Sequence, residues 1–125
     1  MKMTLIGFGN LGQALTKVFL EKKEYLEKNS GFSPNIIAAV DVDGAAIDEN
    51  GLDMQKLLST MEEEETISKY PDKGEKGTSA LDVIKNVDSD LVVELTPTSI
   101  EDGEPGLTHI KKAMNLGKHV VNSIF

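Results

Sequence analysis

Three glycines near the N-terminus, Gly7, Gly9 and Gly12, have the spacing of a turn that holds a phosphate group. They lie between an apolar run at residues 1–6 and a helical pattern that starts at Asn10, in the order strand, G-x-G-x-x-G, helix. The first glycine permits a tight turn, the second lets a pyrophosphate approach the backbone, and the third lets helix and strand pack closely. The N–H groups at the start of the helix would then face the phosphates. The alternative is a tight strand–helix junction that holds no ligand.

Asp41 directly follows a second apolar run, residues 36–40, and stands 29 positions after Gly12. An acidic residue at the end of the second strand accepts hydrogen bonds from the adenosine ribose hydroxyls and repels a 2′-phosphate. The chain contains no arginine to hold such a phosphate. NAD is therefore the expected cofactor, in preference to NADP. The alternative is that Asp41 only stabilises a turn at the end of its strand.

The elements that position these residues alternate between strands and helices. Strands are predicted where apolar residues run continuously, at residues 1–6, 36–40 and 90–95 and from 119 onwards, with a brief one near Ile67. Helices are predicted by spacing near 3.6 residues or by caps, at residues 10–28 and 51–65, after Thr78 or Ser79, and up to Leu116. We expect a single α/β domain, residues 1–125, with a Rossmann-type doubly wound parallel sheet in strand order 3-2-1-4-5 and helices on both faces.

The composition argues against several classes of protein. A net charge of −8 with scattered lysines disfavours binding to nucleic acid or an anionic membrane. The apolar runs are far shorter than the roughly 18 residues of a membrane span, and the residues before the first strand do not predict a secretory signal. Because the chain has no cysteine, it has no disulfide or thiolate metal site, and a cytoplasmic location is expected.

A calcium loop starting at Asp41 is rejected because its twelfth position is Leu52 instead of glutamate. His109 and His119 lack the partners of a zinc site, so no metal site is predicted. His109 is expected to be structural or solvent-facing, and His119 to serve packing.

Polar residues at the end of the 90–95 strand are further candidates for a ligand site. Glu94 lies where open α/β sheets bind ligands. It either contacts the nicotinamide or its ribose, or is satisfied by neighbouring backbone N–H groups. The turn of Thr96, Pro97 and Thr98 follows at the same edge, where it either positions the nicotinamide ribose or only turns the chain.

Four segments together resemble homoserine dehydrogenase over nearly the whole chain. They read G-F-G-N-L-G, V-E-L-T-P-T, G-E-P and G-K-H-V-V, at residues 7–12, 93–98, 103–105 and 117–121. The first motif is common to many dehydrogenases, whereas the other three make the match specific. The family is an oxidoreductase that converts L-homoserine and NAD(P)⁺ reversibly to L-aspartate 4-semialdehyde and NAD(P)H, in threonine and methionine biosynthesis. The resemblance implies an N-terminal Rossmann domain of a dimeric enzyme. The cofactor-binding positions that the motifs and the resemblance indicate are Gly7, Phe8, Gly9, Asn10, Leu11, Gly12, Asp41, Thr96, Pro97, Thr98 and Ser123.

One departure from the family concerns the last residues. After G-K-H-V-V the family usually continues with two residues that are small or carry a hydroxyl group, and then with Asn-Lys. Here Asn122 and Ser123 occupy the first two positions, and Ile124 and Phe125 replace Asn-Lys. The family's substrate-binding and catalytic half has no counterpart in these 125 residues. Hydride transfer needs a held substrate and a positioned acid or base, so the chain alone is expected to bind cofactor with little or no turnover and to contribute no catalytic residue. The alternatives are a regulatory or accessory nucleotide-binding module, and another two-domain dehydrogenase that acts on a small amino acid.

Overall fold

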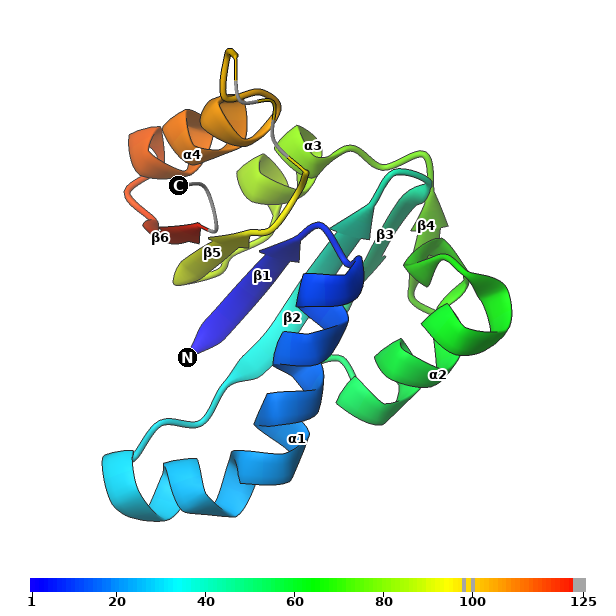
Figure 1. Cartoon of the computed structure of the whole chain (residues 1–125), viewed down its shortest axis with the longest axis vertical. Helices are drawn as coiled ribbons and strands as arrows, with labels where there is room; N and C mark the ends of the chain where they lie inside the picture. The colour runs from blue at the N-terminus through cyan, green and yellow to red at the C-terminus, as the bar shows by residue number, and fades with distance from the viewer. Residues whose placement is uncertain (98, 100, 123–125) are drawn as a thin grey trace.

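A six-stranded sheet forms the centre of the domain, in the order β4-β3-β2-β1-β5-β6 (Figure 1). The computed structural model describes residues 1–97, 99 and 101–122. The strands are β1 (Lys2–Ile6), β2 (Asn35–Asp41), β3 (Gly44–Ile47), β4 (Gly74–Lys76), β5 (Leu91–Glu94) and β6 (His119–Asn122). The pairs β1–β2, β1–β5 and β5–β6 are parallel. The chain passes from β1 to β2 on one side and later reaches β5 on the other, so the strand order reverses between β1 and β5.

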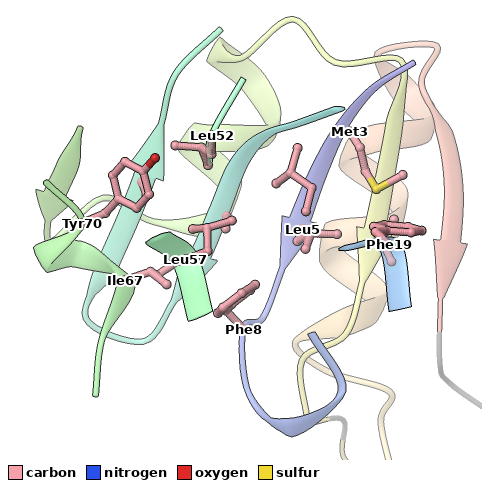
Figure 2. Packing of buried hydrophobic residues seen from close by; sticks show 12 residues of the cluster. Met3, Leu5, Phe8, Phe19, Leu52, Leu57, Ile67 and Tyr70 are labelled. Atoms are coloured by element: carbon pink, nitrogen blue, oxygen red, sulfur yellow. The ribbon is translucent and has the colours of Figure 1, made fainter. Parts of the chain in front are cut away.

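Helices cover both faces of this sheet, which confirms the predicted α/β class (Figure 1). They are α1 (Asn10–Ser30), α2 (Met54–Glu64), α3 (Ala80–Asn86) and α4 (Gly106–Asn115), with a short 3-10 turn η1 (Ile67–Lys69). One cluster of buried side chains joins the sheet to α1 and α2, and a second joins it to α3 and α4. In the first cluster Leu5 of β1 lies with Phe19 of α1 and Leu57 of α2 (Figure 2). Each such buried side chain contributes about 1.5–3 kcal/mol to the free energy of unfolding.

The edge of the sheet beyond β2 differs from the sequence prediction. The prediction of a brief strand near Ile67 is wrong, because this residue begins the 3-10 turn η1. Its side chain is fully buried. Instead, β3 and β4 extend the sheet as antiparallel strands. Val42 and Asp43 form the turn from β2 to β3. A side chain at Gly44 would lie 2.1 Å from the carbonyl oxygen of Glu75 in β4, so a glycine lets the two strands approach. The predicted order 3-2-1-4-5 is therefore right for β2, β1, β5 and β6 and wrong at this edge.

Glycines and a polar N-cap residue mark several of the helix ends. Gly31, with φ of 68°, ends α1, and Gly117, with φ of 74°, follows α4. Ser79 is the N-cap of α3, where its hydroxyl accepts a hydrogen bond from the backbone N–H of Asp82. Among the described residues, no helix combines the length and apolar character needed to cross a membrane.

Candidate functional site

A cleft of about 1160 Å³ opens at the carboxyl ends of β1, β2 and β5. It lies where the strand order reverses, which is the usual ligand position in open α/β sheets. Its walls come from the turn after β1, the β2–β3 turn, the end of α2, the loop before α3, and the segment from β5 to α4. The volume is slightly above the range of about 300–1,000 Å³ that is typical of ligand and cofactor pockets.

The three glycines of the turn after β1 have the geometry that the G-x-G-x-x-G spacing predicts. Gly7 has φ of 96°, and a Cβ there would lie 2.9 Å from backbone atoms of Leu95 and Thr96. A Cβ at Gly12 would lie 2.8 Å from the carbonyl oxygen of Gly7, so this glycine permits close helix–strand packing. Among the described residues, and apart from its own chain neighbours, a Cβ at Gly9 would have no atom within 4 Å. The chain therefore presents bare backbone to open space at the position where a pyrophosphate would approach.

The start of α1 faces this space, and no side chain of the described residues caps it. Gly9 is the N-cap residue and has no side chain to accept a hydrogen bond, and the first turn contains no acidic residue. Asn10 and Leu11, at the start of the helix, line the cleft. The first N–H groups of a helix have no partner within it, and its dipole places partial positive charge there. The open backbone at Gly9 and the uncapped helix start fit a bound phosphate pair.

Asp41 lines the cleft, and its carboxylate is also fully engaged within the protein. One oxygen accepts the backbone N–H groups of Asp43 and Gly44 at 2.9 and 3.1 Å. The other accepts the N–H of Ile67 at 2.9 Å and the hydroxyl of Thr66 at 2.9 Å. The turn-residue alternative for Asp41 is thus realised. Contact with a ribose stays a prediction, and it requires that the carboxylate share lone pairs already in use.

Glu94 is fully buried, and its side chain is held by the residues around it. One oxygen accepts the backbone N–H of Thr96 at 2.8 Å and also the hydroxyl of the same residue. The other oxygen lies 2.6 Å from Nδ1 of His109 in α4. Glu94 therefore matches the alternative of satisfaction by backbone N–H groups only in part, because one N–H and the side chains of Thr96 and His109 bind its carboxylate.

His109 is a cleft residue that the sequence reasoning did not single out. It is buried, as a structural histidine is expected to be, but it also lines the cleft. Its signal in the sequence is indirect: a glutamate at the end of an apolar strand needs a buried donor. Several polar side chains follow Glu94 within twenty residues, and local patterns do not say which of them is the donor.

The other predicted site residues fall into two groups. Thr96 and Pro97 line the cleft, as does Phe8, whose side chain is buried in the core. Thr98 and Ser123 lie outside the described residues. The structure thus brings the glycine turn, Asp41 and the Thr96–Pro97 turn to one cleft, whereas their contacts with a ligand stay predictions.

A mostly parallel sheet, a glycine-rich turn that leads into a helix, and a cleft at the reversal of strand order define a Rossmann-type nucleotide-binding domain. The sequence model of the Glutamate/Leucine/Phenylalanine/Valine dehydrogenase family matches residues 1–94. The chain belongs to this family of dehydrogenases.

Two curated relatives with similar sequences are homoserine dehydrogenases. A homoserine dehydrogenase of Methanocaldococcus jannaschii is 44% identical over 123 residues, which are 98% of this chain and 36% of the relative. An NAD(+)-dependent homoserine dehydrogenase of Pseudomonas canavaninivorans is 31% identical over 126 residues, which are 98% of this chain and 35% of that protein. The chain thus spans about a third of the length of these curated relatives. The predicted resemblance to homoserine dehydrogenase is confirmed.

Two solved structures share the fold. The homoserine dehydrogenase of Thermoplasma acidophilum superposes with a TM-score of 0.78 at 23% identity, over 98% of this chain and 34% of that chain. A hyperthermophilic archaeal homoserine dehydrogenase in complex with NADPH superposes with a TM-score of 0.79 at 22% identity, over 98% of this chain and 35% of that chain. At these identities the likeness shows the fold alone.

Proposed function

We propose that residues 1–125 form the dinucleotide-binding domain of a homoserine dehydrogenase and bind NAD or NADP. The observation that carries this proposal is the open space over Gly9 at the uncapped start of α1, inside a cleft at the switch point of the sheet. The names of the relatives support binding of NAD or NADP, since one curated relative is called NAD(+)-dependent and one solved structure is a complex with NADPH.

The direction of the cofactor follows from the two ends of the cleft. Adenosine belongs on the β2 side, near Asp41, because the acidic residue after the second strand is the one that meets the ribose. The phosphates belong at Gly9 and the start of α1. The nicotinamide then belongs on the β5 side, where Thr96 and Pro97 line the cleft and where Thr98 and Ser123 follow β5 and β6 in the sequence.

A preference for NAD over NADP is part of the proposal. Three carboxylates, those of Asp41, Asp43 and Glu65, belong to residues that line the adenosine side of the cleft. No lysine is among the described residues that line it, and the chain has no arginine. A 2′-phosphate would therefore meet negative charge without a compensating cation.

In the whole enzyme the proposed reaction is the reversible oxidation of L-homoserine to L-aspartate 4-semialdehyde, a step toward threonine and methionine. When bound, the nicotinamide exchanges a hydride with the alcohol carbon of the substrate. This chain contributes binding and orientation of the cofactor. A base must also take the hydroxyl proton, and among the described residues of the cleft there is no lysine to do so. We therefore propose that the chain alone binds cofactor with little or no turnover. A dimeric parent enzyme and a cytoplasmic location belong to the same proposal.

Calorimetric titration of the folded chain with NAD⁺, NADP⁺ and ADP-ribose tests the binding. All three ligands should release heat and raise the melting temperature, with NAD⁺ binding more tightly than NADP⁺. Folded protein that shows neither effect with any of them would overturn the proposed function. Formation of NADH from homoserine and NAD⁺ by the chain alone would contradict the proposed lack of turnover.

A further inference from the structure

Glu94 and His109 form a buried pair at the β5 side of the cleft. Oε2 of the glutamate lies 2.6 Å from Nδ1 of the histidine, and their side chains are 0% and 10% exposed. They come from different elements, since Glu94 ends β5 and His109 lies one turn into α4. Glutamate is almost never fully buried unless it is paired, and this pair lies at the wall of the cleft.

Hydrogen bonds fix the direction of the imidazole. Oε1 of Glu94 accepts the N–H and the hydroxyl of Thr96, so this oxygen acts as an acceptor. An ionised carboxylate accepts at both oxygens, so Nδ1 of His109 carries the hydrogen in the bond to Oε2. In the neutral ring, Nε2 then keeps its lone pair. The carboxylate thus determines which ring nitrogen is left as an acceptor.

His109 is itself part of the cleft wall, whereas the oxygens of Glu94 are taken by Thr96 and His109. In the described part of the chain, no partner is recorded for Nε2 of the histidine. The residue lies on the β5 and α4 side of the glycine turn, away from the β2 side that holds Asp41. Under the proposed function, this is the nicotinamide side.

We propose that Glu94 and His109 position the nicotinamide, with Nε2 of the histidine accepting a hydrogen bond from the carboxamide N–H₂ of the cofactor and the glutamate holding the ring in that tautomer. Both are positioning residues, and the inference rests on the proposed dinucleotide binding. The competing explanation is that the pair only connects β5 to α4, because a buried pair also stabilises a fold and loss of one partner leaves the other without compensation.

Comparison of two ligands separates these explanations. ADP-ribose has the adenosine and both phosphates of NAD⁺ but lacks the nicotinamide. His109→Gln keeps an N–H donor for Glu94 while removing the ring nitrogen acceptor. We expect the affinity for NAD⁺ to fall about tenfold, the effect of one hydrogen bond, and the affinity for ADP-ribose to stay within about twofold of the wild type. Equal losses for both ligands, or no loss for either, would overturn the inference.

The wild-type chain and a second histidine provide the controls. His119, in β6, is exposed and is not a cleft residue, so His119→Gln should leave both affinities unchanged. A wild-type chain that binds neither NAD⁺ nor ADP-ribose would defeat the proposed function itself. A wild type that binds both, with a His109→Gln variant that loses both equally, would defeat only this inference.

A second variant and a measurement without mutation guard against unfolded protein. Glu94→Gln places an amide N–H₂ toward Nδ1, which moves the ring hydrogen to Nε2 and turns the acceptor into a donor. It should show the same selective loss for NAD⁺. In the ¹⁵N-labelled wild type, the Nε2 resonance of His109 should shift on adding NAD⁺ and stay in place on adding ADP-ribose, with His119 as internal reference. An unchanged Nε2 resonance at saturating NAD⁺ would overturn the inference even if both variants failed to fold.

Discussion

The hydroxyl of Thr66 lies 2.9 Å from Oδ2 of Asp41, across 25 positions of sequence. The same carboxylate accepts the backbone N–H groups of Asp43 and Gly44 in the hairpin and of Ile67 in η1. Asp41 therefore joins the β2–β3 turn to the segment after α2, at the side of the cleft where we propose that adenosine binds. Under the proposed function, its carboxylate has two roles, one in folding this edge and one in setting the charge next to the bound cofactor.

Asp41→Asn should separate these two roles. The amide oxygen can still accept from the hairpin, but the amide N–H₂ cannot accept from Ile67 or Thr66, so the free energy of unfolding should fall by about 1–3 kcal/mol. Removal of the negative charge should raise the ratio of NADP⁺ to NAD⁺ affinity about tenfold, an effect of roughly 1.4 kcal/mol. Denaturant unfolding and calorimetry measure the two effects.

The control for that variant is Asp48→Asn. Asp48 also accepts a backbone N–H two residues on, from Asn50 at 3.0 Å, but it is not a cleft residue. It should change neither cofactor affinity. A stable Asp41→Asn protein with the wild-type ratio of affinities would show that Asp41 does not set cofactor preference.

Gly9→Ala should lower dinucleotide affinity and keep stability, whereas Gly12→Ala should lower stability. A methyl group at Gly9 enters open space, and its φ of −82° suits alanine, so stability should hold while dinucleotide affinity falls at least about tenfold through contact with the phosphates. A methyl group at Gly12 would lie 2.8 Å from the carbonyl oxygen of Gly7. The free energy of unfolding should therefore fall by about 1–3 kcal/mol. Melting curves and NAD⁺ titrations distinguish the two. Full affinity in a folded Gly9→Ala protein would place the phosphates elsewhere.

Salt should alter the cofactor preference because the carboxylates at the adenosine side act through charge. The Debye length shrinks from about 10 Å at 0.1 M to about 3 Å at 1 M ionic strength. Screening should therefore raise the affinity for NADP⁺ relative to NAD⁺ as potassium chloride is added. Parallel titrations of both cofactors at two salt concentrations measure the ratio. A ratio that falls with salt would mean that a cation, and not these carboxylates, governs the 2′-position.

Local sequence patterns were sufficient for the parts of this fold whose partners are close in the chain. The glycine turn depends on residues within six positions, and the cap at Ser79 on a residue three positions away, so spacing predicts both. The strands β1, β2 and β5 are continuous apolar runs because helices cover them on both faces. In contrast, β3 and β4 are short antiparallel strands of small and polar residues such as Ala45 and Gly74. Their pairing depends on close approach at Gly44, which no local apolar pattern reveals.

Contacts across the fold explain what sequence reasoning missed in the site. The sequence indicates that Asp41 follows a strand, but Thr66 meets it only because α2 and η1 return to the same edge of the sheet. Glu94 and His109 are fifteen positions apart, and their contact depends on how α4 packs against β5. Residue types and spacing thus predicted the position of the cleft. The engagement of its carboxylates followed from tertiary packing.

Thr4→Val should stabilise the domain. Thr4 lies in the central strand β1 with no exposed surface, and its hydroxyl has no hydrogen-bond partner in the described part of the chain. Valine has nearly the same shape without the polar atom, so the free energy of unfolding should rise by about 1 kcal/mol and the melting temperature by a few degrees. Thr16→Val is the matched control. Thr16 is equally buried, but its hydroxyl donates to the carbonyl oxygen of Gly12 at 2.8 Å, so removal of this hydroxyl should not raise the melting temperature. Differential scanning calorimetry of the two variants decides the matter: a Thr4→Val protein that melts below the wild type would reveal a partner for that hydroxyl, such as a buried water.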